Sequence, residues 1–373
     1  MFTACFADAD GRAILARDDQ GRSQEINPHW LRERCRSDAS IDRLTGQRLF
    51  NLADLDPDLA LKLAEETAPG LLRVIFTDRH ESYFRTAELL AELNRPVFDD
   101  GTPPIEPWTA SLNALPQADW SATREPAALL ALLDQYLRRG FVILRGVPAE
   151  PGHVIEAARR FGFPRETNFG LLFDVRSVPE ASDLAYTALA LDPHTDNPYR
   201  EPVPGIQLLH CLVNETAGGL STLVDGFAVA EALRSEAPED FALLTTIPMR
   251  FRYRDAGTDL VACAPLIALD LGGRVGAIHF SPRLDYAPFM ASADLAAFYR
   301  AKSRFDRMCR SARFELCFRL DAGDLVMFDN RRLLHGRTSF DPTEGLRHLQ
   351  GCYIDGDGPR SLYRVLRRNG DMA

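Results

Sequence analysis

The sequence predicts a mainly β protein with flanking helices, in which a small β-rich N-terminal domain precedes a larger domain built on a closed or rolled sheet. Three observations support this prediction. Many short apolar runs are separated by turn residues, few helical periods lie among them, and prolines crowd together near residue 100. At 373 residues the chain has room for two cores. We therefore expect a domain at residues 1–95, a linker at 96–120 and a second domain at 121–373.

The N-terminal domain and the linker differ in composition. The apolar runs at 12–16 and 72–76 predict strands, and residues 86–93 predict a short helix. The segment that follows sustains neither a helix nor a ladder, because proline donates no backbone hydrogen bond. It carries large aromatic side chains as well, which we interpret as a linker lying on the surface: Pro96, Pro103, Pro104, Pro107, Trp108, Pro116 and Trp120.

The larger domain begins with a helix at residues 125–139, which Gly140 is expected to end as a C-cap. A buried strand at 141–147 and a helix at 151–161 follow. The remaining pattern predicts strands at 206–213, 221–224, 249–253, 276–280, 314–320 and 325–328, and helices at 228–235, 240–246, 293–310 and 361–368.

Composition excludes several classes of partner. The formal net charge of −10 argues against nucleic acid, which needs a basic face, and suits a cationic substrate. No apolar run approaches the eighteen residues of a membrane span, and the N-terminus lacks the shape of a signal peptide. Seven cysteines, odd in number and scattered, are typical of reduced thiols. We expect a cytoplasmic protein.

The stretch LDPHTDNPY (residues 191–199) places an imidazole and a carboxylate two residues apart, at His194 and Asp196. Side chains two apart on an extended strand share a face, so both can reach one metal ion. A second histidine, His335, follows a strand-like run far downstream. Two histidines and one carboxylate form the facial triad of non-haem Fe(II) oxygenases, with open metal positions for a co-substrate and dioxygen (O2).

An isolated H-x-D is a weak motif, and a basic residue strengthens it. Arg347 lies twelve residues beyond His335 in a strand-like run, and its guanidinium suits bidentate anchoring of a dicarboxylate. Ser221, after the turn at Gly218-Gly219, is a second candidate for that carboxylate. This order of residues also argues against two competing functional classes, a metal hydrolase and a catalytically inactive ligand-binding protein. A metal hydrolase needs no dicarboxylate anchor, and a protein that only binds ligands needs no complete triad.

With these residues assembled, the chain resembles the γ-butyrobetaine hydroxylase family of Fe(II)/2-oxoglutarate oxygenases. The resemblance is carried by WLR (30–32), PGIQLLHC (204–211), VDGF (224–227), FDNRRLLHGR (328–337) and RHLQGCY (347–353). It implies a double-stranded β-helix (jelly-roll) core that carries Fe(II) on His194, Asp196 and His335. It also implies 2-oxoglutarate as co-substrate, a small N-terminal domain and a homodimer.

The resemblance includes one departure in the N-terminal domain. Members of the family normally hold a structural zinc through C-x-C-x-x-C and a later histidine. Here only Cys35 and His80 remain, with serines at Ser37 and Ser40. Neutral hydroxyls are poor replacements for thiolates on zinc. We predict no zinc.

The family's substrates carry a trimethylammonium group in an aromatic cage, a use of cation–π attraction. The matching positions are Phe169, Phe173, Tyr186 and Tyr353, and Asp183 is a carboxylate that suits a place beside the cation. Singly, each aromatic is better explained as core packing. As a set at matched positions they favour the cage. The segment 168–178 is our candidate for a lid.

The other end of the substrate site differs from the family. Asn197 stands where γ-butyrobetaine hydroxylases commonly have a tyrosine, and Arg283 lies in a loop where relatives have asparagines. A smaller amide and a guanidinium suit a bulkier, more highly charged anion such as a phosphonate. The chain therefore resembles the family's 2-(trimethylamino)ethylphosphonate dioxygenase branch, which hydroxylates the carbon next to phosphorus. γ-Butyrobetaine is the alternative substrate.

Overall fold

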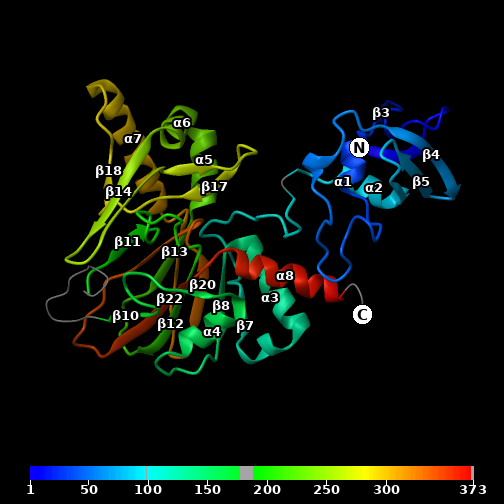
Figure 1. The fold of residues 1–373 in the computed structure, drawn as a ribbon. Coiled ribbons are helices and arrows are strands. Elements are labelled where there is room, and N and C mark those ends of the chain that lie inside the picture. Colours follow the sequence, from blue (N-terminus) through cyan, green and yellow to red (C-terminus); the bar gives the residue numbers. More distant parts are fainter. Residues whose placement is uncertain (98, 177–187, 371–373) are drawn as a thin grey trace. The chain divides into compact units, whose positions relative to one another are not determined.

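The computed structural model describes residues 1–97, 99–176 and 188–370 of the 373. The chain divides into two compact units, Met1–Asp99 and Asp100–Ala373 (Figure 1). The division falls within the Pro-rich stretch that we predicted as a linker. No helix among the described residues is both long and apolar enough to cross a bilayer.

Unit 1 consists of two small antiparallel sheets and short helices. One sheet has the order β1-β2-β3 and the other β4-β5-β6. Leu31, Leu72 and Val74 lie fully buried in its core. The elements are β1 (Phe2–Ala7), β2 (Ile14–Asp18), β3 (Ser23–Glu25), α1 (Pro28–Glu33), η1 (Leu52–Asp54), β4 (Leu61–Ala68), β5 (Leu71–Phe76), β6 (Glu81–Arg85) and α2 (Thr86–Leu93).

Unit 2 is built on two sheets, of which the larger has seven strands in the order β10-β22-β12-β20-β8-β7, with β9 also paired to β22. Non-sequential strands lie side by side: β12 pairs with β22 on one side and with β20 on the other. The strands are β7 (Gln117–Asp119), β8 (Phe141–Arg145), β9 (Pro164–Arg165), β10 (Phe173–Arg176), β12 (Ile206–Asn214), β20 (Leu325–Asp329) and β22 (Arg347–Ile354).

The smaller sheet has four antiparallel strands in the order β11-β21-β13-β19. They are β11 (Leu191–His194), β13 (Ser221–Asp225), β19 (Glu315–Phe318) and β21 (Leu333–Arg337). A core cluster lies between the two sheets, with Phe141 and Phe328 from the larger sheet and Leu223 and Leu333 from the smaller one. This is the jelly-roll arrangement, and the predicted fold class is confirmed.

Helices cover the outer face of the larger sheet (Figure 1). They are α3 (Pro126–Arg139), preceded by η2 (Ser121–Arg124), α4 (His153–Phe161) and α8 (Asp357–Gly370). Gly140 ends α3 with a left-handed φ of 80°, and its N–H donates to the Tyr136 carbonyl, as expected for a C-cap. Side chains alternate between the two faces of β22. Leu349 lies in the core between the sheets, whereas Cys352 and Ile354 pack under the helices, so odd-numbered residues face inward.

An insertion between β13 and β19 forms its own layer (Figure 1). Phe251, Phe280 and Phe305 are fully buried in its core. It contains α5 (Gly226–Glu236), α6 (Pro238–Thr246), β14 (Pro248–Arg254), β15 (Asp259–Pro265), β16 (Ile267–Leu269), β17 (Val275–Ile278), β18 (Asp285–Tyr286) and α7 (Ser292–Cys309).

Trp108, which we placed in a surface linker, is instead buried in unit 2. Its ring packs at 5.3 Å on Phe141, and its indole N–H donates to the Arg139 carbonyl at 2.7 Å. Its backbone N–H donates to Asp225 at 2.9 Å. Because both of its donors are paired, the large ring can be buried without cost from unpaired polar groups.

Candidate metal centre and active site

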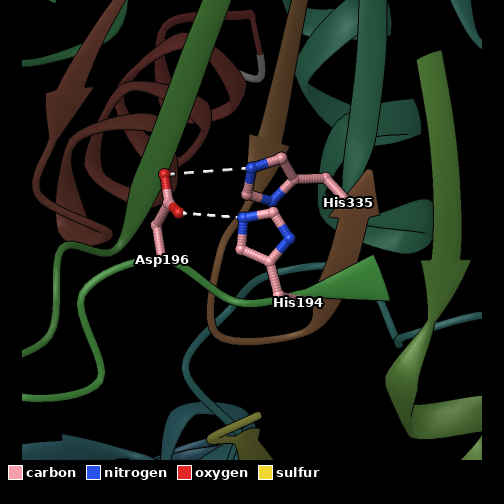
Figure 2. Close-up of side chains that lie close together, drawn as sticks. All are labelled: His194, Asp196 and His335. Carbon is pink, nitrogen blue, oxygen red and sulfur yellow. Dashed lines mark ion pairs between the residues drawn. The ribbon is translucent and has the colours of Figure 1, made fainter. Parts of the chain in front are cut away.

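The side chains of His194, Asp196 and His335 converge beside strands β11 and β21 of the smaller sheet (Figure 2). Asp196 Oδ1 lies 3.3 Å from His194 Nε2, and Oδ2 lies 3.8 Å from His335 Nε2. The two imidazole rings are 4.3 Å apart between centroids, because His194 and His335 are cross-strand partners on β11 and β21. Within the described ranges, this is the only group of three or more His, Cys, Asp or Glu side chains whose possible ligand atoms all lie within 4.8 Å of one another.

Asp196 is placed differently from our expectation. We expected His194 and Asp196 to share the face of one strand, but β11 ends at His194 and Asp196 follows in a loop. The loop is held by Asn330, which is fully buried. Its Oδ1 accepts from the Asp196 N–H at 2.7 Å and its Nδ2 donates to the Asp196 carbonyl at 2.9 Å. The amide of Asn330, rather than strand alternation, sets the position of the carboxylate.

The electrostatics favour metal binding at neutral pH. Burial lowers the pKa of His335 to about 3, with further lowering by His194 and by the charge of Arg283, so its ring is neutral. Burial by itself would raise the pKa of Asp196, but the two histidines and Tyr353 hold it well below its ordinary range. His194 Nδ1 lies 2.9 Å from the Asp192 carbonyl, which leaves Nε2 as the lone-pair nitrogen. Neutral imidazoles and a carboxylate are the donor set that Fe(II) requires.

Arg347 is a buried cation at the start of β22. Its Nε donates to the Gly219 carbonyl at 3.2 Å, and a Cβ at Gly219, which has a φ of 67°, would lie 2.6 Å from that nitrogen. Ser221 begins β13 two residues later. Among the described residues, no carboxylate forms an ion pair with Arg347, whose burial lowers its pKa. The turn therefore leaves room for the guanidinium, and the missing counter-charge fits an anionic co-substrate.

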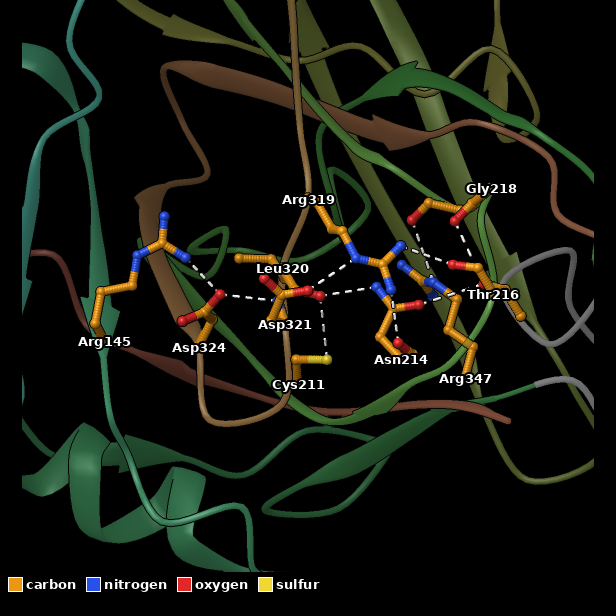
Figure 3. A network of polar contacts seen from close by, with 11 residues as sticks. Arg145, Cys211, Asn214, Thr216, Gly218, Arg319, Leu320, Asp321, Asp324 and Arg347 are labelled. Atoms are coloured by element: carbon orange, nitrogen blue, oxygen red, sulfur yellow. Dashed lines mark hydrogen bonds and ion pairs between the residues drawn. The ribbon is translucent and has the colours of Figure 1, made fainter. Parts of the chain in front are cut away.

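The loop beside Arg347 is braced by a network of polar contacts (Figure 3). Arg319 donates to the carbonyls of Asn214 and Thr216, at 2.6 and 2.7 Å.

Arg337 adds a second guanidinium near Arg347. Both guanidinium groups lie over the ring of Phe340, at 5.3 Å for Arg337 and 5.6 Å for Arg347. Burial, and then the charge of Arg347, lower the pKa of Arg337 to about 10. Two neighbouring cations in a buried position attract a dicarboxylate more strongly than one.

The predicted aromatic residues fall into two contacts. Phe173 packs on Tyr353 with ring centroids 5.3 Å apart. Phe169 packs at 5.5 Å on Tyr253, which in turn stacks at 5.2 Å on Tyr199. The sequence did not indicate Tyr253, because it comes from β14 of the insertion, far from the other aromatics in the chain.

Two predicted cage residues, Asp183 and Tyr186, lie outside the described residues, as do the last two positions of the lid candidate 168–178. The described part of that segment includes β10, which is hydrogen-bonded to β22 as an edge strand.

The two residues predicted for the anionic end are placed differently. Asn197 is buried with a left-handed φ of 54°, and its Oδ1 accepts from the Tyr199 hydroxyl at 2.5 Å. Its Nδ2 is buried and makes no hydrogen bond of normal geometry to the described residues, although it lies close enough to Tyr353 to lower that hydroxyl's pKa in part. Arg283 lies in an exposed turn, and its charge acts on His335.

The other histidines of unit 2 do not join the triad. His279 Nδ1 lies 3.0 Å from the Pro265 carbonyl, and His348 pairs with Asp174 at 2.7 Å. His210 is fully buried and neither ring nitrogen has a hydrogen-bond partner of normal geometry in the described chain. Burial lowers its pKa to about 4. His210 therefore lies in the core and not in the triad.

In unit 1, three of the positions that match the family's zinc ligands also come together. Ser37 and Ser40 hydroxyls lie 3.0 Å apart, and His80 Nε2 lies 3.4 and 3.2 Å from them. Arg32 Nη1 donates to Ser40 at 3.1 Å. Cys35 donates to the Leu31 carbonyl. These residues form a hydrogen-bonded cluster with a guanidinium beside it, a poor environment for a divalent cation, and the absence of zinc stays a prediction.

Comparison with known proteins identifies the family. Residues 101–353 match the family described as taurine catabolism dioxygenase TauD, TfdA family. A gamma-butyrobetaine dioxygenase of Pseudomonas sp. (strain AK-1) is 42% identical over 366 residues, covering 96% of this chain and 94% of that protein. The human gamma-butyrobetaine dioxygenase is 31% identical, covering 91% and 90%. The chain therefore belongs to the TauD/TfdA dioxygenase family.

As a member of the TauD/TfdA family and a relative of the γ-butyrobetaine hydroxylases, the chain is an oxygenase enzyme. Its cofactors are those of the family, Fe(II) and 2-oxoglutarate, and the His-Asp-His triad is consistent with Fe(II) binding. A solved non-haem iron oxygenase, OrfP in complex with Fe and alpha-ketoglutaric acid, matches with a TM-score of 0.49 and 18% identity over 64% of this chain and 83% of that one.

Proposed function

We propose that this enzyme hydroxylates 2-(trimethylamino)ethylphosphonate at the carbon next to phosphorus. The class of substrate is supported by the relatives, which include gamma-butyrobetaine dioxygenases and a trimethyllysine dioxygenase of Meyerozyma guilliermondii that is 29% identical over 93% of this chain. Both names indicate a trimethylammonium group. The phosphonate rests on one observation: a buried amide donor on Asn197 and the positive charge of Arg283 both lie near the metal ligands.

Each residue of the site has a proposed role. His194, Asp196 and His335 hold the metal, while Arg347 and Ser221 bind the distal carboxylate of 2-oxoglutarate. When bound, Fe(II), 2-oxoglutarate and dioxygen together supply the oxidising power that hydroxylates a C–H bond. The protein supplies orientation: a substrate held at both ends presents one methylene to the metal.

The two ends of the substrate are recognised by different side chains. Among the described residues, Phe173 and Tyr353, together with Phe169, are the aromatic side chains proposed for the trimethylammonium group. The other two predicted residues, Asp183 and Tyr186, lie outside the described residues. At the other end, Asn197 Nδ2 donates to a phosphonate oxygen and Arg283 neutralises its charge. A phosphonate offers three oxygens and a higher charge than the carboxylate of γ-butyrobetaine, so it uses both groups.

γ-Butyrobetaine is the second candidate, because the relative from Pseudomonas with that name is 42% identical and matches nearly the whole chain. A cytoplasmic homodimer stays our prediction for the assembly, supported by seven free thiols and by the family resemblance.

The experiment that tests the proposal measures succinate and hydroxylated product for both substrates side by side, with Fe(II), 2-oxoglutarate and ascorbate. We expect a higher kcat/KM for the phosphonate. Arg283→Gln should raise the KM for the phosphonate roughly 10- to 100-fold, because a hydrogen bond to a charged group contributes about 1.5–3 kcal/mol.

Arg274→Gln is the matched control, since Arg274 is exposed and pairs with Asp270 in the turn between β16 and β17. It should leave both KM values unchanged. A preference for γ-butyrobetaine in the wild-type enzyme would overturn the phosphonate proposal in favour of the second candidate. Turnover with zinc and without 2-oxoglutarate would contradict the oxygenase chemistry itself.

A further inference from the structure

The side chain of Asn330 holds the backbone of Asp196, but these hydrogen bonds do not reach its carboxylate. Asn330 binds both the N–H and the carbonyl of Asp196 and also donates to the Pro204 carbonyl at 3.0 Å. These bonds fix the main chain of the loop against the turn between β20 and β21. The orientation of the carboxylate still depends on its own side-chain torsions, and therefore on what its two oxygens contact.

Tyr353 supplies the strongest of those contacts. Its hydroxyl donates to Asp196 Oδ2 at 2.7 Å, within the range of charge-assisted O–H···O bonds. Asp196 Oδ1 faces His194 Nε2 at 3.3 Å. A carboxylate with one oxygen held by a hydroxyl presents the other oxygen to a metal, so the bond selects one of the two possible orientations.

The ring of the same tyrosine belongs to the aromatic contact with Phe173, at 5.3 Å and 33°. Phe173 lies opposite Gly351 on the neighbouring strand, and a Cβ at Gly351 would come within 2.5 Å of its ring atoms. Glycine at this position therefore lets the Phe173 ring reach the inner face of β22, beside Tyr353. Tyr353 is 3% exposed, and its ring packs directly on that of Phe173.

We propose that Tyr353 is a positioning residue that couples occupancy of the aromatic site to the orientation of the metal-binding carboxylate of Asp196. A quaternary ammonium against the ring fixes the ring, and the hydroxyl on that ring then fixes Asp196 Oδ2. The inference rests on the proposed function only in taking the ligand of the aromatic site to be a trimethylammonium cation. Because binding linkage is reciprocal, the cation must tighten metal binding by the same factor by which the metal tightens cation binding.

The test is an anaerobic Mn(II) titration with and without tetramethylammonium chloride, which fills the aromatic site without the anionic end of a substrate. For the wild-type enzyme we expect tighter Mn(II) binding in the presence of the cation. Tyr353→Phe keeps the ring and removes the hydroxyl. We expect it to bind Mn(II) about tenfold more weakly, the usual cost of losing an outer-sphere partner, and to show no change on adding the cation.

The matched control is Tyr363→Phe, which removes another tyrosine hydroxyl, one that donates to Asp134 on the helical face. It should titrate like the wild type. Phe173→Leu retains the hydroxyl of Tyr353 and should lose only the effect of the cation. The visible spectrum of the Co(II)-loaded proteins provides a second readout, since a change in ligand geometry alters it in Tyr353→Phe and not in Tyr363→Phe.

Wild-type Mn(II) affinity in Tyr353→Phe, or an undiminished effect of the cation in either Tyr353→Phe or Phe173→Leu, would overturn the coupling. The titration requires no turnover, so its outcome is separate from that of the substrate assay. If the cation tightens Mn(II) binding but neither trimethylammonium compound is hydroxylated, the proposed substrate fails and the coupling stands.

Discussion

Each of the two units brings a histidine together with short polar side chains from distant parts of the chain, but only one of the resulting clusters has a negative charge at its centre. In unit 2 the carboxylate of Asp196 lies between His194 and His335. In unit 1 the hydroxyls of Ser37 and Ser40 take the corresponding place beside His80.

The charged groups beside the two clusters also differ. The unit 1 cluster has the guanidinium of Arg32 within hydrogen-bond distance of Ser40, and burial and that charge lower the pKa of His80. In unit 2 the pKa of Asp196 lies well below its ordinary range, and the Tyr353 hydroxyl donates to the ionised carboxylate. Convergence of side chains is therefore not enough to make a metal site: the sign of the charge at the centre decides between a site for a cation and a structural hydrogen-bond cluster.

The largest effect is expected when the negative charge of the unit 2 cluster is removed. Asp196→Ala should lower coupled turnover by more than about 100-fold, because loss of a ligand costs more than loss of an outer-sphere partner. Succinate and product formation measure the effect. Asp192→Ala is the control from the same stretch, since the Asp192 side chain is exposed and only its carbonyl contacts His194. Near-normal activity of Asp196→Ala would show that Asp196 is not a ligand.

The converse change adds charge to unit 1. Ser37→Cys together with Ser40→Cys places two thiolates beside His80 and Cys35, and we expect the doubly substituted protein to bind about one equivalent of zinc. Atomic absorption after dialysis measures it, and adding Cys35→Ser should weaken the binding. Zinc near one equivalent in the wild type, unchanged by Cys35→Ser, would instead reveal a different zinc site.

A smaller effect is expected for His210, a buried histidine with neither a carboxylate nor a hydroxyl as partner. Its pKa of about 4 lies below the ordinary value near 6.5, so the unfolded chain binds the proton first. The stability due to neutral His210 is present above pH 6.5 and is lost as the pH falls, by roughly 2 kcal/mol at pH 5. Urea unfolding at pH 7.5 and 5 should show this loss in the wild type and a smaller one in His210→Leu. Equal losses in both proteins would contradict the prediction.

The sequence predicted the parts of the site that depend on residue type and spacing. The three triad residues do meet. Helices α3 to α8 and strands β8, β12, β13, β14, β17, β19 and β20 lie close to their expected bounds, whereas β7, β9, β10, β15, β16 and β18 were not predicted. In unit 1, the short strands β1, β3, β4 and β6 were not predicted, because brief polar-edged runs carry little periodicity.

What sequence reasoning missed depends on contacts between distant residues. It did not find the role of Asn330, because the amide acts on the backbone of a residue 134 positions away. It treated Tyr353 only as an aromatic ring, although its hydroxyl contacts Asp196, and it did not find Tyr253. Such contacts follow from strand order and register, which no local pattern in one sequence specifies.

The buried ion pair of Arg332 and Asp225 has a practical consequence for anyone who divides this chain. Arg332 also donates to the carbonyls of Glu106 and Arg138, at 2.9 and 2.8 Å, and the Trp108 N–H donates to Asp225. A fragment that starts after the Pro-rich segment would lose the Glu106 carbonyl and the Trp108 N–H from this buried pair. Arg332 directly precedes β21, the strand that carries His335. Expression fragments of unit 2 should therefore begin ahead of Glu106, so that the segment that looks most like a dispensable tether is retained.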